Sequence, residues 1–138
     1  MHFDRALHPE LLVFYRESFN LSCGYSQKII VDVSGCKILH KHFIEKSRMM
    51  HILECTISKT HIEQLIRLVN RKTLTAYAAI PDEQKTETGY RDGWSLHYKV
   101  LFRDPPSFSG ILNLFYQENP LEQALDFLRQ VYSDISSF

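Results

Sequence analysis

The segment WSLHYKVLF, residues 94–102, alternates apolar and polar side chains along its length. A period of two residues places every second side chain on the same face of a β-strand. The pattern therefore predicts a strand with one face in the core and a mildly basic, solvated face opposite. The core face comprises Trp94, Leu96, Tyr98, Val100 and Phe102, and the solvated face Ser95, His97, Lys99, Leu101 and Arg103.

Three segments nearer the N-terminus have the composition of neighbouring strands. Residues 11–16, LLVFYR, form a short apolar and aromatic run that is typical of a strand. In residues 27–33, QKIIVDV, alternation predicts a half-buried strand. The dipeptide Ser34-Gly35 then predicts a two-residue turn, so we expect residues 36–43 to form the hairpin partner.

Two further strands are expected on either side of residues 94–102. The apolar run MMHILECTI, residues 49–57, favours one of them. After a break at Asp104-Pro105-Pro106, Ser109-Gly110 predicts a turn that brings residues 111–116, ILNLFY, back against residues 94–102.

An apolar stripe with helical spacing follows residue 60. Its members recur at i, i+3, i+4 and i+7, which predicts an amphipathic helix. Thr60 is the expected N-cap, because Glu63 lies three residues later and completes a capping box. The stripe is Ile62, Leu65, Ile66 and Val69, and Arg67, Arg71 and Lys72 are expected late in the same helix.

A second helix start stands at Asn119-Pro120-Leu121-Glu122. Asn119 suits the N-cap, Pro120 suits the first helical position, and Glu122 closes the box. The predicted apolar stripe is Leu121, Ala124, Leu125, Leu128, Val131, Tyr132 and Ile135.

Together these elements predict an α+β fold in one domain over residues 1–138. Consecutive strands with short turns favour an antiparallel sheet, here of about five or six strands. Two amphipathic helices need a surface to cover, and one face of the sheet supplies it. The opposite face would stay partly exposed unless it meets a partner.

Composition narrows the classes of function. Sixteen basic residues balance sixteen acidic ones, whereas nucleic-acid binders carry a basic excess, so we expect no nucleic-acid partner. No apolar run reaches the length of a membrane span, and the N-terminal segment MHFDRALHPE does not have the pattern of a secretory signal. The odd set Cys23, Cys36 and Cys55 without paired spacing then favours reduced thiols in a cytoplasmic protein.

Motifs for catalysis are lacking in the sequence, and we predict neither an enzyme nor a cofactor. The chain has no Gly-x-Ser-x-Gly elbow and no Gly-rich phosphate loop. His40 and His42 lie two apart in a predicted strand and share a face, yet a zinc site needs a third ligand. No spacing selects His51, His61 or His97 as that ligand, so solvated histidines are the favoured interpretation.

The approach to residues 94–102 is the predicted partner-contact segment. Residues 81–89 form the most polar window and are expected to be a loop that enters the strand through Asp92-Gly93. Aromatic residues and arginine dominate interface energetics. The predicted contacts are Tyr90, Arg91, Asp92 and Trp94, with Arg103 and Tyr116 as weaker additions, although alternation favours a core position for Trp94.

Several of these segments, taken together, resemble one group of small bacterial proteins. They are LVFYRESF, IIVDVSG, SKTHIEQLIRLV, YRDGWSLHYKV and NPLEQALDFL. The order resembles that of the emfourin-type inhibitors of thermolysin-like metalloproteases, from about Leu11 to Ile135. A Gly-Gly-Phe is typical after the first strand of that family, and Ser18-Phe19-Asn20 stands here, so no inhibitory residue is transferred. The resemblance implies a non-catalytic protein that binds another protein.

Cytoplasmic immunity proteins for secreted bacterial toxins are often single α/β domains of this size as well. The leading hypothesis is therefore an inhibitor or immunity-type protein that neutralises a toxin or protease. One alternative is a small enzyme or ligand-binding protein with a pocket near His97, His40 and His42. Another is a domain that self-associates through the open sheet face or an edge strand.

Overall fold

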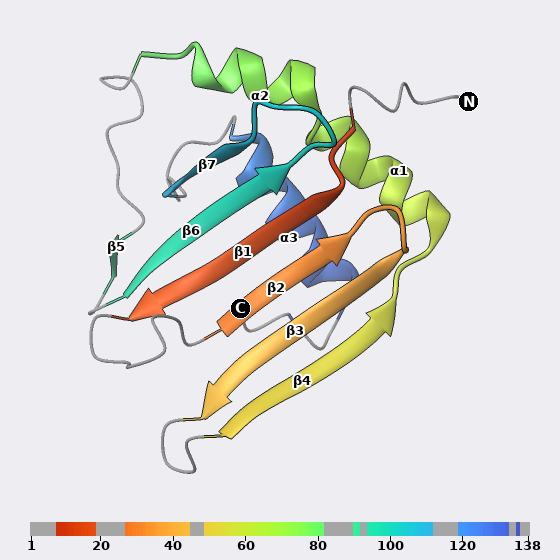
Figure 1. Ribbon diagram of the computed structural model, residues 1–138, viewed down its shortest axis with the longest axis vertical. Helices are drawn as coiled ribbons and strands as arrows, with labels where there is room; N and C mark the ends of the chain where they lie inside the picture. The colour runs from red at the N-terminus through yellow and green to blue at the C-terminus, as the bar shows by residue number, and fades with distance from the viewer. Residues whose placement is uncertain are drawn as a thin grey trace.

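A computed structural model describes residues 8–18, 27–44, 49–81, 90–91, 94–111, 119–132 and 135. Within these ranges the chain forms one antiparallel sheet with helices packed on one of its faces (Figure 1). The elements are β1 (Leu11–Ser18), β2 (Gln27–Asp32), β3 (Lys37–Ile44), β4 (Met49–Thr56), α1 (Lys59–Leu68), α2 (Arg71–Ala78), β5 (Tyr90–Arg91), β6 (Trp94–Leu101), β7 (Phe108–Ile111) and α3 (Pro120–Val131). The predicted α+β class is confirmed.

The sheet has the strand order β4-β3-β2-β1-β6-β5, and β7 also pairs with β6. Among the described strands β5 has only two residues, so six strands make up most of the sheet, within the predicted number of about five or six. β1 lies in the middle because it pairs with β2 on one side and β6 on the other. The central strands therefore come from both halves of the chain.

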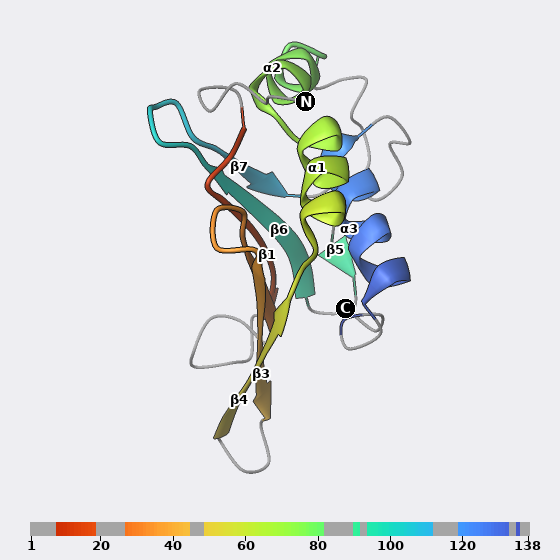
Figure 2. The same ribbon diagram turned by 90° about the vertical axis from the view of Figure 1, so that its right-hand side faces the viewer.

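One face of the sheet forms the core together with the helices (Figure 2). Leu12 lies opposite Val100 and Phe14 opposite Tyr98, so the apolar sets of β1 and β6 share this face. Alternation thus predicted the face of Leu96, Tyr98 and Val100 correctly. The core is completed by side chains from every helix, among them Ile62, Leu65, Leu74, Leu121, Leu125 and Leu128.

The first helical region differs from the prediction. Ser58, not Thr60, is the N-cap of α1, and its hydroxyl accepts a hydrogen bond from the backbone N–H of His61. The helix ends at Leu68, and Asn70 then starts α2 with a capping box whose other member is Thr73. Arg71 and Lys72 therefore begin a second helix, which sequence analysis had not separated from the first. The two helices form one bent segment of 20 residues.

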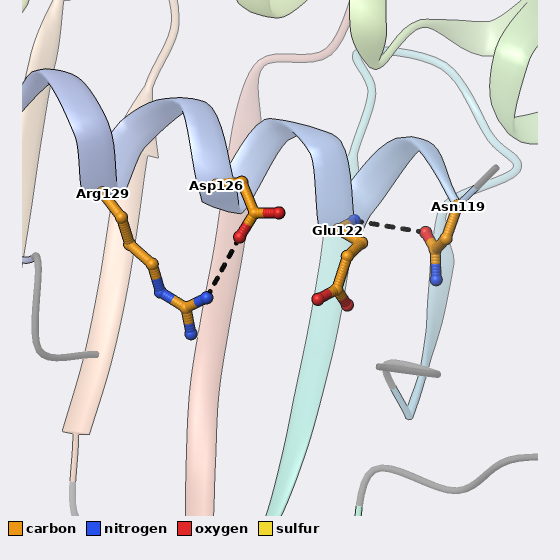
Figure 3. A network of polar contacts seen from close by, with 4 residues as sticks. All are labelled: Asn119, Glu122, Asp126 and Arg129. Atoms are coloured by element: carbon orange, nitrogen blue, oxygen red, sulfur yellow. Dashed lines mark hydrogen bonds and ion pairs between the residues drawn. The ribbon is translucent and has the colours of Figure 1, made fainter. Parts of the chain in front are cut away.

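The N-cap and the first residue of α3 were predicted correctly, whereas no capping box with the Glu122 side chain is seen. Asn119 Oδ1 accepts the backbone N–H groups of Leu121 and Glu122, at 2.8 and 3.3 Å, and Pro120 is the first helical residue (Figure 3). One turn further on, Arg129 forms an ion pair with Asp126 at 3.2 Å. The predicted apolar stripe is interrupted only at Val131, which is 38% exposed and not in the core.

The predicted turn at Ser109-Gly110 is wrong. Both residues lie inside β7, which pairs with β6, and the reversal occurs earlier, over residues 103–107. Residues 112–116 of the predicted strand lie outside the described residues, as does the predicted loop at 82–89. None of the described helices is long and apolar enough to cross a membrane.

Candidate interaction site on the open sheet face

The sheet has a second face that no described helix covers (Figure 2), and we call it the open face. The alternation of each strand places on it the residues between those of the core. Within the described residues it includes Leu11, Val13, Tyr15, Lys28, Ile30, Asp32, Lys37, Leu39, Lys41, Phe43, Met50, Ile52, Glu54, Thr56, His97, Lys99, Leu101, Ser109 and Ile111. This face is much more apolar than the solvated face that the sequence of β6 alone had suggested.

Apolar side chains form the floor of a shallow hollow in the open face. Leu11, Ile30 and Leu39 line it from β1, β2 and β3, and its volume is about 270 Å³. Charged side chains from Asp32, Lys37 and Glu54 complete its lining, and Lys37 Nζ lies 3.1 Å from Glu54 Oε1. An apolar floor with a charged rim is the composition of a surface that buries a side chain of a partner.

A basic band crosses the open face beside the hollow. Lys28 and Lys41 are direct partners on β2 and β3, so their positive charges stand on neighbouring strands. Like charges in this arrangement repel each other. Tyr15 is the partner of Lys28 on the other side, and its ring stacks on His97 with centroids 5.0 Å apart. The two positive charges attract carboxylates of a partner that docks here.

Val13 lies at the centre of the face. It is only 8% exposed, although no described helix covers it. Its direct partners are Ile30 on β2 and Lys99 on β6. The hollow, the basic band and Val13 thus form one continuous surface on the middle strands of the sheet.

The histidines do not converge on one pocket. His40 and His42 lie on the helix side of β3, where their parallel rings are 6.3 Å apart and His40 Nε2 lies 3.2 Å from Gln27 Oε1. His97 lies on the open face, so the predicted grouping with His40 and His42 does not occur. His51 is the direct partner of His42, and His61 Nδ1 instead contacts Tyr132 Oη at 2.9 Å. Among the described residues no group of three or more His, Cys, Asp and Glu could hold a metal ion.

The contact residues predicted from sequence are spread along β6. In the backbone register Tyr90 pairs with Ser95 and Arg91 with Trp94, at the N-terminal end of that strand. Arg103 follows the C-terminal end, where it is exposed and lines a hollow of about 370 Å³ with His8, Pro9, Glu10 and Ser34.

The two groups are separated by the length of β6, on the order of 25 Å at about 3.3 Å per residue. They therefore do not form one compact patch. Asp92 and Tyr116 lie outside the described residues.

Sequence analysis missed the apolar floor on β1, β2 and β3. The signal was present, because LLVFY and II are contiguous apolar runs in which both strand faces are apolar. Such runs are typical of strands that are covered on both sides. The helices cover only one side, and the other is the open face.

Comparison with known proteins adds no assignment. No family model matches the chain, and no curated protein matches it. The case for function therefore rests on the surface described above.

Proposed function

We propose that the protein is a non-catalytic binding domain whose partner is another protein, docked on the open face. The observation that supports this is the position of the apolar hollow directly beside the basic band of Lys28 and Lys41. Interfaces combine an apolar centre with a polar rim, and charged groups around it select the partner. The fitting partner presents an apolar side chain next to carboxylates.

Within this proposal the protein acts as an inhibitor or immunity-type protein that neutralises a toxin or protease in the cytoplasm. A rigid sheet suits this role, because a preformed surface loses little conformational entropy on binding. The free thiol of Cys36 agrees with a reducing compartment. Tyr90, Arg91 and Arg103 remain predicted contacts, and they would extend the interface at the two ends of β6.

Affinity capture from the native cell tests the proposal. The parent protein and three variants, Leu39→Asp, Lys41→Glu and Lys59→Glu, serve as bait at moderate salt. Leu39 lines the hollow and Lys41 belongs to the band, whereas Lys59 is an exposed residue of α1 on the helix side. Lys59→Glu thus controls for a charge reversal away from the open face.

We expect the parent and Lys59→Glu to retain a stoichiometric protein partner. The other two variants should bind it at least about tenfold more weakly, which corresponds to about 1.4 kcal/mol. A partner held equally by all four proteins contradicts docking on the open face. Capture of no partner by the parent contradicts the binding function itself.

A further inference from the structure

The outer edge of the sheet at β4 has no partner among the described elements. β4 pairs with β3 along its inner side, and it ends the strand order of the sheet (Figure 1). An edge strand presents backbone N–H and C=O groups that are able to pair with another strand. β4 has eight residues, so the edge is a long one.

Large apolar side chains are concentrated on this strand. The three most exposed ones in the described chain are Met49 at 58%, Ile52 at 56% and Leu53 at 56%. Ile52 lies on the open face as the partner of Lys41, and Leu53 lies on the helix face as the partner of His40. Both faces of β4 therefore carry exposed apolar surface.

The β3–β4 hairpin extends beyond the ends of α1 and α3 (Figure 2). The chain enters α1 at Lys59, just after the Thr56 end of β4, so the Met49 end is the projecting half. Access to this half of the edge is open on both faces of the sheet as far as the described elements are concerned.

Natural edge strands carry features that prevent pairing with another chain, such as lysine or proline residues. The sequence of β4, MMHILECT, contains neither. Its one acidic residue is Glu54, whose charge is paired with Lys37. The side chains of β4 therefore favour association through this edge.

We propose that two copies of the chain associate by antiparallel pairing of their β4 strands about a two-fold axis at His51. A two-fold axis perpendicular to the sheet keeps the helix layers of both copies on the same side of the joined sheet. Directly opposed residues must then lie on the same face, so even-numbered residues pair with even-numbered ones and odd-numbered with odd-numbered ones. With His51 at the axis, Met49 lies opposite Leu53 of the partner subunit, and Met50 lies opposite Ile52 of the partner subunit. Every apolar residue of the projecting half then has an apolar partner.

Registers with the axis nearer Glu54 are less favourable. An axis at Ile52 places Met50 opposite Glu54 of the partner subunit, and an axis at Leu53 places Ile52 opposite Glu54 of the partner subunit. Both bring a carboxylate onto an apolar side chain. With the axis at His51, only the projecting halves of the two β4 strands lie side by side, so the two α1 helices do not meet. This self-complementarity favours a second copy over an unrelated strand.

Sedimentation of the full chain over a range of concentrations tests the association. Ile52→Lys and Leu53→Lys place a charge on the edge from opposite faces, and both positions are exposed enough to accept lysine. Ile111→Lys is the matched control, because Ile111 is 37% exposed on β7 at the far side of the sheet. Circular dichroism of each variant verifies that it is folded.

We expect the parent and Ile111→Lys to form a dimer. Each β4 variant should raise the dimer dissociation constant at least tenfold. A parent that sediments as a monomer at the highest concentration overturns the proposal, as do folded β4 variants that dimerise like the parent.

Cross-linking tests the register. Directly opposed residues have Cβ atoms about 4.5–5.5 Å apart, close to the separation in a disulfide. His51→Cys should therefore give a disulfide-linked dimer under mild oxidation, and Glu54→Cys, which does not face its own copy, should stay at the level of the parent. A Glu54→Cys variant that cross-links as well as His51→Cys overturns the assigned axis.

This inference is independent of the proposed function. Leu53 lies on the helix face, so Leu53→Lys should weaken the dimer at least tenfold and still capture the partner of the open face. Lys41→Glu should lose that partner whether or not the chain dimerises. The failure of one proposal is thus distinguishable from the failure of the other.

Discussion

At the scale of single residues, Gly110 explains why the turn prediction failed. Gly110 is the direct partner of Tyr98 on β6, and a Cβ atom built on it would lie 3.3 Å from Tyr98 Oη. A side chain at this position would crowd the tyrosine ring, which approaches the backbone of the neighbouring strand. A Ser-Gly pair indicates a turn in most sequences, and the sequence alone does not reveal an approach from residue 98.

Tyr98 also gives the protein a response to alkaline pH. Burial raises the pKa of Tyr98 above its ordinary value of about 10. The folded state therefore favours the protonated phenol. This contribution to stability is fully present below pH 10 and is lost as the pH rises through the folded-state pKa.

We predict that the free energy of unfolding falls above pH 10, and that Tyr98→Phe makes this fall shallower. Urea denaturation at several pH values between 8 and 11 measures it. Some slope should remain, because burial also raises the pKa of Tyr132. Equal slopes for the parent and Tyr98→Phe above pH 10 would contradict the assignment.

At the scale of elements, local patterns predicted the strands with regular alternation and the helix with a strong cap. They failed where an element is short or where two elements adjoin. α2 buries only Leu74 and Tyr77, so its apolar stripe is too short to stand out. Its basic first residues, Arg71 and Lys72, were interpreted as the end of α1 because cations favour a helix C-terminus.

Asn70 is the residue that divides α1 from α2. Its Oδ1 accepts the backbone N–H of Thr73 at 3.0 Å, and its Nδ2 donates to the carbonyl of Ile66 at 2.8 Å. It therefore caps the start of one helix and binds the last turn of the other.

We predict that Asn70→Ala lowers the free energy of unfolding by about 1–2 kcal/mol. Chemical denaturation measures the loss, and hydrogen exchange should show faster exchange in α2 than in α3. Ser58→Ala is the control, because Ser58 caps α1 alone. If Asn70→Ala lowers the free energy of unfolding no more than Ser58→Ala does, the link between the two helices adds no stability.

At the scale of the whole molecule, the fold could be predicted but the candidate site could not. The fold follows from alternation and helical spacing, which each segment carries by itself. The open face combines Leu11, Ile30 and Leu39 from separate strands, and pairing of the lysines depends on the register of β2 and β3. A net charge of zero also conceals a local basic band, since a sum does not record position.

We predict that binding of the partner weakens with salt although the chain is formally neutral. Opposite charges across an interface attract less as ions screen them, with a Debye length of about 8 Å at physiological ionic strength. Titrations between low and high salt should show a rise in the dissociation constant that is smaller for Lys41→Glu. Lys59→Glu should keep the slope of the parent, and a parent without any salt dependence would contradict a role for the band.

The two margins of the sheet are very unequal, and this limits how far an assembly grows. Among the residues that the structure describes, β4 offers eight residues at one margin, whereas β5 offers two and β7 four at the other. A two-fold pair consumes the long margin of both chains, and the short ones that remain provide little ladder for another copy. In the proposed dimer β4 therefore both drives association and is used up by it, so the assembly is a closed pair and not an endless fibre.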